Sequence, residues 1–436
     1  MRRRTAVTAL AAGALLLVGS AGGFYTVAHD RQALAGQSSS VAAVDPLEAS
    51  ITAAQQRLEE VPADWTTWAQ LGSAYVEQAR VTADPSYYER ADGALARSLA
   101  LHPEGNDAAL TGLGALANAR HDFAAAADLA GRALAINSYS ATAWGVLTDA
   151  RTQLGDHTGA TEALQRMLEL KPGVASFTRA SYDAELHGDL VLARSALEQA
   201  LALAVAGGGD AAFCRAHLGG LAFSTGDLDE AAAQFAAGLE TAPGDVPLLL
   251  GQARVAAARG EVEAAVAGFR AVAGASPLPE HLVEYGEYLE FLGRAAEAEQ
   301  QYALVATVRQ LFAANGVSDD LSTALFAADH GDPQAALAAA TAEYERRQNV
   351  DSQDALAWAL HSAGRDAEAL PLARQATSLG GRNALFLYHR GAIEAALGMD
   401  AEARATLTDA LHTNPHFSPL LAPRAQALLD SLGGRP

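Results

Sequence analysis

The chain has 436 residues, half of them hydrophobic, and carries a formal net charge of −21 at pH 7. This acidity argues against nucleic acid as a partner, because binding to phosphate backbones needs clustered lysine and arginine, and Lys171 is the only lysine. The single cysteine, Cys214, excludes a disulfide within the chain and a cysteine-rich metal site. The acidity serves either plain solubility or attraction of a partner with a basic face.

The first residues have the pattern of an export segment. Three arginines at residues 2–4 precede an uncharged run over residues 5–28, and basic residues before an apolar run direct the following chain across a membrane. The run is long enough to span a bilayer, and residues 19–21 resemble a cleavage site. Residues 1–28 are therefore interpreted as a signal peptide or a signal anchor, followed by a flexible linker over residues 29–45. We expect an extracytoplasmic protein, secreted or tethered to the cell membrane by this segment alone.

Beyond the linker, one alanine recurs at nearly fixed spacing. Subtracting neighbouring positions gives steps of 35, 34, 33, 38, 34, 33, 38, 33 and 34 residues, and a glycine precedes each of the last eight alanines by five residues. A period near 34 residues with this punctuation is typical of stacked helix-turn-helix units. The alanines are Ala91, Ala126, Ala160, Ala193, Ala231, Ala265, Ala298, Ala336, Ala369 and Ala403, and the glycines are Gly155, Gly188, Gly226, Gly260, Gly293, Gly331, Gly364 and Gly398.

The third unit shows how such a unit is built. Trp144 and Leu147 are three residues apart and share one face of a first helix. Gly155 ends that helix in a left-handed turn. Ala160 is small enough for close approach of the second helix, and Pro172 stops that helix. Since no long stretch alternates like a strand, the predicted fold class is all-α: an α-solenoid superhelix of about ten antiparallel helix pairs.

This frame resembles the tetratricopeptide repeat (TPR) family, whose pattern is W-x₂-L-G-x₂-Y, then A-x₃-F, then P. The resemblance covers a cap helix at 46–62, about ten repeats over 63–415 and a second cap helix at 417–432. Small end helices suit a solenoid, which must show water a polar end face. The residues that match are Trp68, Leu71, Gly72, Tyr75, Ala91 and Pro103; Leu218, Gly219, Ala231, Phe235 and Pro243; Ala265, Phe269 and Pro277; Tyr285, Gly286, Ala298 and Tyr302; and Gly391, Ala403 and Pro415.

Three segments depart from the pattern. The first unit has about seven extra residues within 79–90, a glycine-rich insert occupies 207–210, and a long apolar join spans 307–320. The last two account for the two steps of 38 residues. We expect them to kink the superhelix and divide the stack into three or four blocks.

No catalytic arrangement stands out in the sequence. P-loop, HExxH and GxSxG motifs are absent, so we expect no enzymatic activity, no cofactor and no metal site. The stretch over residues 329–332 (DHGD) occupies the turn of its unit and is interpreted as a helix cap.

The resemblance implies that the first helix of each unit lines a concave groove that binds an extended or helical peptide. The carboxylate clamp of some family members is absent, because the first unit offers Thr66, Ala69 and Ser73 instead. The groove positions implied by the resemblance are Arg179, Tyr182, Glu185, Arg254, Glu284, Glu287, Glu290, Asp354, Trp358, His361, Tyr388 and His389.

Two features of the expected groove have two interpretations each. Glu284, Glu287 and Glu290 lie three residues apart, and form either a solvated helix face or a contact for a partner that bears arginine or lysine. Trp358 is either an anchor for a partner, together with Tyr388, or a residue that packs between helices.

The predicted function is a non-catalytic scaffold, of bacterial origin by its alanine- and arginine-rich composition, that binds proteins or peptides outside the cytoplasmic membrane. One alternative is an accessory subunit that presents a client to an envelope maturation or secretion enzyme. A second is an enzyme, although no segment outside the repeats is long enough for a catalytic domain. A third is self-association through the concave face.

Overall fold

A computed structural model describes residues 46–82, 84, 86–314 and 319–433. The predicted export segment (1–28) and linker (29–45) lie outside the described residues. Within them the chain forms 22 α-helices and no strand, which confirms the all-α prediction. None of the helices in these ranges has the length and apolar character needed to cross a membrane.

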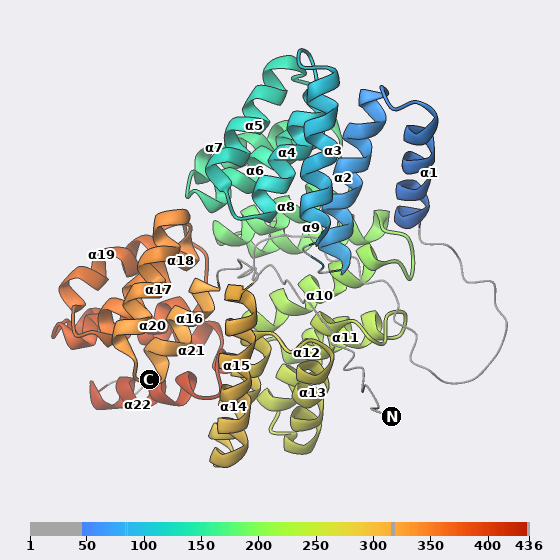
Figure 1. The fold of residues 1–436 in the computed structure, drawn as a ribbon. Helices are drawn as coiled ribbons and strands as arrows, with labels where there is room; N and C mark the ends of the chain where they lie inside the picture. The colour runs from blue at the N-terminus through green and yellow to red at the C-terminus, as the bar shows by residue number, and fades with distance from the viewer. Residues whose placement is uncertain (1–45, 83, 85, 315–318, 434–436) are drawn as a thin grey trace, which may run out of the picture.

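Ten helix pairs follow one another along the described chain, preceded by α1 and followed by α22 (Figure 1). The predicted α-solenoid of about ten pairs is therefore confirmed, and the pairs are numbered here as units 1 (α2–α3) to 10 (α20–α21). The helices are α1 (Pro46–Glu60), α2 (Trp65–Thr82), α3 (Ser86–Leu101), α4 (Asp107–Ala119), α5 (Phe123–Ile136), α6 (Ala141–Gln153), α7 (His157–Leu170), α8 (Val174–Leu186), α9 (Leu190–Leu203), α10 (Gly209–Ser224), α11 (Leu228–Leu239), α12 (Val246–Ala258), α13 (Val262–Ala275), α14 (Pro279–Phe291), α15 (Ala295–Ala314), α16 (Asp320–Asp329), α17 (Pro333–Arg346), α18 (Val350–Ser362), α19 (Asp366–Ala376), α20 (Ala384–Ala396), α21 (Asp400–Thr413) and α22 (Leu421–Ser431).

The repeated alanines and glycines do what their spacing predicts. All ten alanines are at most 2% exposed, because they lie where the two helices of a unit are packed together. All eight glycines have a φ between 71° and 85°, the left-handed conformation that glycine adopts without a steric penalty. In unit 2, His121 takes this position with a φ of 61°. Asp332 caps α17 by accepting a hydrogen bond from the backbone N–H of Ala335 (3.1 Å), which confirms the helix-cap interpretation for the end of the 329–332 stretch.

Substitution of Gly260 by alanine isolates the energetic cost of this turn. A Cβ atom at Gly260 meets nothing within 4 Å, but the residue has a φ of +74°. We expect Gly260→Ala to lower the free energy of unfolding by about 1–2 kcal/mol. The matched control is Gly131→Ala, at an equally uncrowded position inside α5, which should raise it by about 0.5–1 kcal/mol. Denaturant melts of both variants check the prediction, and a shift of the same sign in both would contradict it.

The glycine of the L-G motif allows close contact between the two helices of a unit. A Cβ atom at Gly219 would lie 2.4 Å from the Phe235 ring, and one at Gly286 would lie 2.4 Å from the Tyr302 ring. The same contact joins Gly391 to Leu407, where the distance would be 2.8 Å. A large side chain of the second helix therefore fills the place of the missing Cβ of the first, which explains the pairing of these motif residues in the sequence.

The expected join over residues 307–320 is shorter than predicted. Helix α15 continues to Ala314, because residues 307–314 include no glycine or proline to end it. The Tyr302 ring of α15 packs edge-on against Phe326 of α16 and against His330, which follows α16, at 5.3 and 4.9 Å between centroids. Within residues 307–314, Arg309 lies 5.2 Å from the centroid of the Phe326 ring, whereas Leu311 is 58% exposed.

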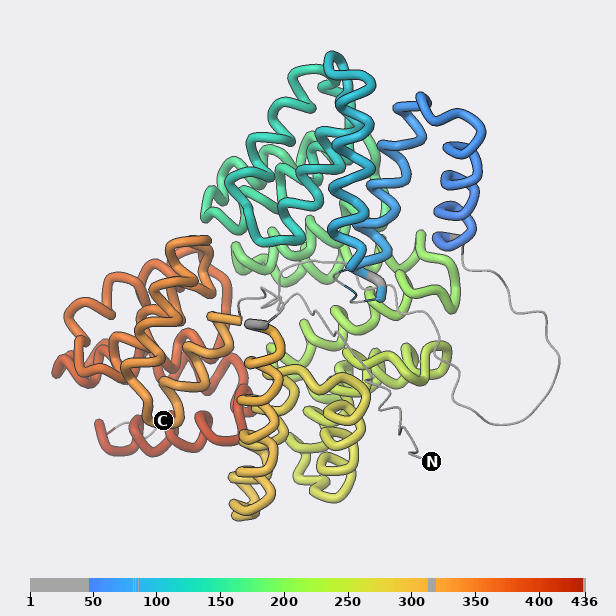
Figure 2. Tube along the Cα trace, in the orientation of Figure 1, coloured from blue at the N-terminus to red at the C-terminus, as the bar shows by residue number. Residues whose placement is uncertain are grey.

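The C-terminal units of the solenoid return to contact its N-terminal ones. In Figures 1 and 2 the orange helices α17–α18 approach the teal helices α6–α7, although roughly five units separate them in the chain. Asn349 of the α17–α18 join donates a hydrogen bond to Gln153 of α6 (2.9 Å), and Asn414 after α21 donates one to the carbonyl of Phe223 in α10 (3.0 Å). The pitch of the superhelix is therefore small enough for successive turns to touch.

Candidate functional site

Charged groove residues on the first helices are paired across neighbouring units. The guanidinium of Arg179 in α8 binds both carboxylate oxygens of Asp149 in α6, at 2.7 and 2.6 Å. Arg254 in α12 binds Glu284 in α14 in the same way, at 2.6 and 2.8 Å. Two-point pairs of this kind hold both side chains in one geometry. These residues lie on first helices, and their charges have partners within the chain.

The aromatic groove residues are buried between helices α16, α18 and α20. Trp358 donates a hydrogen bond from Nε1 to Asp329 (2.9 Å), and its ring stacks on His389 with centroids 4.1 Å apart. His389 contacts Asp354 through Nδ1 (2.8 Å), and these two side chains are 1% and 2% exposed. Trp358 and Tyr388 are 7% and 6% exposed. The packing interpretation therefore holds for Trp358, and these four residues are not open to a partner in this structure.

The two remaining predicted groove residues with aromatic rings, His361 and Tyr182, also contact nearby residues of this chain. His361 contacts Asp366 across the turn between α18 and α19. Tyr182 lines a hollow of about 20 Å³ together with six residues from α8, α9 and α10. That volume holds a water molecule but no larger ligand. The other residues that line it are Thr178, Ser181, Glu185, Leu197, Phe213 and His217.

The three glutamates of α14 differ from one another in their contacts. Glu284 is held by Arg254, as described above. Glu290 accepts a hydrogen bond from the Tyr302 hydroxyl (3.0 Å) and lies 3.8 Å from Nε2 of His330. The half-buried Glu287 has no hydrogen-bond or ion-pair partner within the part of the chain that the structure describes. Glu287 is therefore the member of the stripe whose charge is left without a direct counterion.

The surroundings of Glu287 favour its protonated form. Burial raises the pKa of its carboxyl to about 8, and the neighbouring carboxylates of Asp329, Glu284 and Glu290 add to this effect, against a smaller opposing effect of Arg424 in α22. A guanidinium or ammonium group placed here would stabilise the ionised carboxylate. The arrangement can therefore bind a cationic group, with release of a proton near neutral pH.

Sequence reasoning placed neither Asp329 and Glu280, which belong to this acidic site, nor the nearby Arg424 in the groove. Asp329 was interpreted as part of a helix cap, yet its carboxylate faces Glu287 and binds Trp358. Arg424 lies on the terminal helix, which carries no repeat motif. Glu280 lies in the first turn of α14, four residues before Glu284, and burial raises the pKa of its carboxyl to about 7. Its spacing of four residues from Glu284 was the one signal in the sequence that could have identified it. The acidic site is defined here as Glu280, Glu284, Glu287, Glu290 and Asp329.

Chemistry other than ion pairing has little support in the described residues. No group of three or more histidine, cysteine, aspartate or glutamate side chains in these ranges is arranged to hold a metal ion. Burial raises the pKa of the Cys214 thiol to about 12, so the thiol is protonated at neutral pH and is a poor nucleophile.

The packing within each helix pair identifies the type of α-solenoid. Each unit is a helix pair with a buried alanine in its second helix, and in several units a glycine of the first helix packs against a large side chain of the second. The fold is a tetratricopeptide-repeat solenoid. This confirms the family resemblance predicted from the sequence motifs.

Comparisons with known proteins find similar solved structures, at low TM-scores. No protein-family model matches the sequence, and no curated protein matches it. A TPR protein from Parabacteroides merdae is 19% identical, with 60% of this chain and 99% of that chain covered and a TM-score of 0.35. A TPR protein from Thermus thermophilus is 25% identical, with 44% and 98% covered and a TM-score of 0.38. Yeast Tom70 is 14% identical, with 89% and 85% covered and a TM-score of 0.33.

Proposed function

We propose that this TPR solenoid is a non-catalytic scaffold that binds proteins or peptides bearing arginine or lysine, and that it acts outside the cytoplasmic membrane. The observation that supports the binding is Glu287, a half-buried carboxylate among other carboxylates without a counterion of its own. Such an arrangement destabilises the unliganded fold, and a basic side chain would relieve the repulsion. The proposed location is supported by the arginines and apolar run of residues 2–28 in the sequence.

Charge complementarity explains why a basic partner would find this site. The chain carries a net charge of −21, which attracts cationic partners over distances of about 10 Å at moderate salt. The acidic site then offers a localised position for one or two cationic groups. Long-range attraction and local pairing together predict fast binding that weakens as salt is raised.

Reversal of the acidic stripe tests the proposal. We expect Glu284→Lys, Glu287→Lys and Glu290→Lys together to weaken binding of a short fluorescent oligoarginine peptide roughly tenfold or more, because attraction by three carboxylates is replaced by repulsion from three ammonium groups. Fluorescence anisotropy at low and moderate salt measures the change. The matched control reverses three exposed carboxylates on second helices or directly after one: Asp92, Glu198 and Glu240.

The control variant changes the net charge by the same amount. A difference in peptide binding between the two variants therefore reports the acidic site and not the overall charge of the chain. Equal binding by the control and the stripe variant would contradict the proposed site. Because Glu284→Lys also breaks the pair with Arg254, the single variant Glu287→Gln is measured beside it, and it should weaken binding several-fold while both described contacts of Glu284 and Glu290 remain.

A further inference from the structure

Three consecutive turns of the N-terminal half face three consecutive joins of the C-terminal half. The turns belong to units 3, 4 and 5, and the joins follow units 8, 9 and 10. Successive turn residues are 33 and 38 positions apart, and successive join residues are 32 and 35 positions apart. One repeat along the N-terminal stack therefore faces one repeat along the C-terminal stack. The facing residues are Gly155 and Gln348, Gly188 and Gly380, and Gly226 and Pro415. These three pairs and their neighbours are called the latch.

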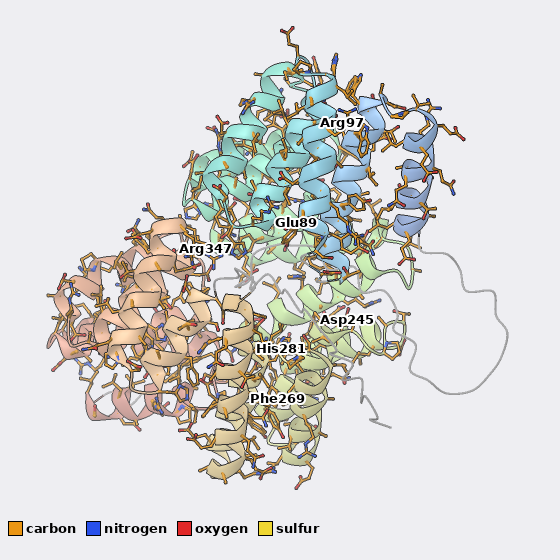
Figure 3. All side chains as sticks on the ribbon, in the orientation of Figure 1. Glu89, Arg97, Asp245, Phe269, His281 and Arg347 are labelled. Carbon is orange, nitrogen blue, oxygen red and sulfur yellow. The ribbon has the colours of Figure 1, made fainter. Side chains whose placement is uncertain are left out.

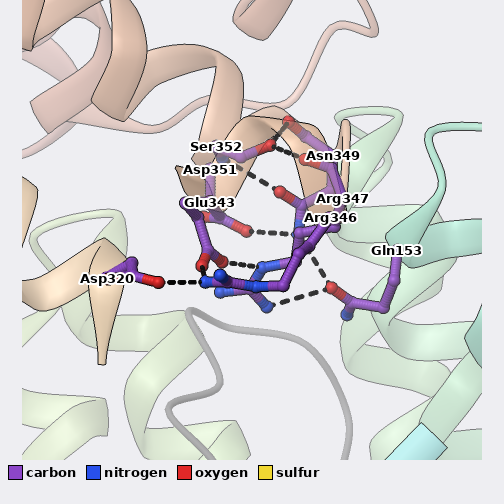
Figure 4. Close-up of polar contacts among 8 residues, drawn as sticks. All are labelled: Gln153, Asp320, Glu343, Arg346, Arg347, Asn349, Asp351 and Ser352. Carbon is purple, nitrogen blue, oxygen red and sulfur yellow. Dashed lines mark hydrogen bonds and ion pairs between the residues drawn. The ribbon is translucent and has the colours of Figure 1, made fainter. Parts of the chain in front are cut away.

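Polar contacts make up the first step of the latch, shown in Figure 4. Gln153 accepts hydrogen bonds at Oε1 from Arg347 (3.2 Å) and Asn349 (2.9 Å), and its backbone carbonyl accepts one from the N–H of Gln348 (3.2 Å). Arg347, which follows α17, is also ion-paired with Glu343 of that helix. Figure 3 places Arg347 where the C-terminal helices meet the N-terminal ones. The side chain and backbone carbonyl of Gln153 therefore accept hydrogen bonds from donors of the C-terminal half. The Arg347 donor is held in place there by its ion pair with Glu343.

The second step is a direct contact between two backbone segments. A Cβ atom at Gly188 would lie 2.3 Å from the carbonyl oxygen of Gly380, and one at Gly155 would lie 2.5 Å from that of Gln348. Real Cβ atoms do not approach so closely, so both contacts require glycine. A small apolar patch lies beside them, where Leu186 of α8 packs against a cluster that includes Phe386 of α20.

Like charges oppose each other within this contact. Glu185 near the end of α8 lies close to Asp351 at the start of α18, and burial followed by the Asp351 charge raises the pKa of the Glu185 carboxyl to about 7. The other titratable or charged groups around Glu185 are Tyr182 on the same helix, His217 of α10 in the hollow they share, and Arg347 in the join. Burial lowers the pKa of His217 to about 4, so it is neutral here. Above pH 7 the ionised Glu185 therefore weakens the contact.

We propose that the latch is releasable: it holds the superhelix closed and opens to admit a partner to the acidic site on α14. Hydrogen bonds, glycine backbone contacts and one small apolar patch form it, and interfaces within a chain that are small and polar permit relative motion. The opposed carboxylates of Glu185 and Asp351 reduce its stability further. The opening is independent of the proposed function, whereas the admission of a partner rests on it.

Alanine substitution of the latch glycines tests the opening. In Gly155→Ala/Gly188→Ala the new Cβ atoms collide with the carbonyls of the facing joins. The matched control is Gly260→Ala/Gly293→Ala, which changes the same turn position at the same positive φ, but in units whose turns meet nothing within 4 Å. Both variants carry equal backbone strain. Only the first should open the latch.

Small-angle X-ray scattering and amide hydrogen exchange measure the result without any partner. We expect a larger radius of gyration for the latch variant and faster exchange of the Gln348 amide, which donates to Gln153 in the closed form, with both quantities near wild type in the control. The same behaviour in both variants would overturn the proposal. Should the latch variant fail to fold by circular dichroism, Gln153→Ala serves instead, since it removes the Oε1 acceptor of Arg347 and Asn349 without any collision. It keeps the backbone carbonyl that accepts from the Gln348 N–H, so faster exchange of Gln348 reports opening of the latch. Unchanged exchange at Gln348 in that variant would also overturn the proposal.

The admission of a partner is tested on the same proteins with the oligoarginine peptide. The open variant should bind the peptide several-fold faster than the control, with little change in the dissociation rate. Equal association rates would refute the gating role while the opening itself stands. If no variant binds the peptide, the proposed function fails and the scattering result still decides whether the latch opens.

Discussion

Phe235→Ala is expected to lower the free energy of unfolding by about 3–5 kcal/mol, the largest effect of any single truncation discussed here. The Phe235 ring is 3% exposed and lies between two glycines of successive first helices. Cβ atoms at Gly219 and Gly251 would fall 2.4 and 2.3 Å from it. Loss of the ring leaves a cavity between units 5 and 6, which neither glycine can fill. Denaturant melts and hydrogen exchange over α10–α12 measure the change.

A compensating variant makes this prediction specific. Added to Phe235→Ala, the pair Gly219→Ala and Gly251→Ala places two methyl groups beside the cavity, so the triple variant should be more stable than Phe235→Ala alone. In the presence of the ring, the same two alanines should be destabilising by about 1–3 kcal/mol through overpacking. Additive effects of the three substitutions would show that the ring and the glycines are not coupled in this way.

Glu287→Gln is expected to stabilise the protein at alkaline pH while it weakens partner binding. The folded-state pKa of Glu287 is raised to about 8 from an ordinary value of 4.5. Its protonated form thus contributes stability that is fully present below the ordinary pKa and is lost as the pH rises through about 8. Glutamine is neutral at every pH and avoids this loss. At about pH 9 the variant should be more stable than wild type by on the order of 1–3 kcal/mol, less than the full shift because the side chain is half-buried and partly screened by water.

Chemical denaturation across the pH range checks the sign of this effect. The advantage of Glu287→Gln should be small at about pH 4 and grow towards about pH 9. Glu198→Gln on the exposed face of α9 is the control, and should show no such trend. A variant that is less stable than wild type at alkaline pH would mean that Glu287 has a stabilising partner, and would remove the basis for the acidic site.

Local features of the fold follow from the sequence of each unit. The alanine and glycine periods identify the ten helix pairs, the buried contact between their helices and the left-handed turns, because each depends on residues fewer than about 40 positions apart. Arg254 and Glu284, both placed on first helices from the sequence, form an ion pair between adjacent units.

The binding role of the twelve groove residues stays a prediction, and the structure changes which of them are open to a partner. Sequence positions alone do not tell an exposed residue of a concave face from one that packs between first helices. Trp358 and His389 are stacked in the interior, whereas Glu287 keeps access to water. The difference depends on how closely neighbouring units approach, and hence on side chains from two or three units at once.

The sequence by itself determined the repeat, its helix pairs and the acidic stripe on α14. Only the tertiary structure decided that units 3–5 meet units 8–10, that Glu185 faces Asp351, and that Asp329 joins the stripe. The reason is that the pitch of a solenoid is the sum of small rotations between many neighbouring units. No single unit encodes that sum, so contacts between residues almost 200 positions apart, such as Gln153 and Asn349, appear only when the whole superhelix is assembled.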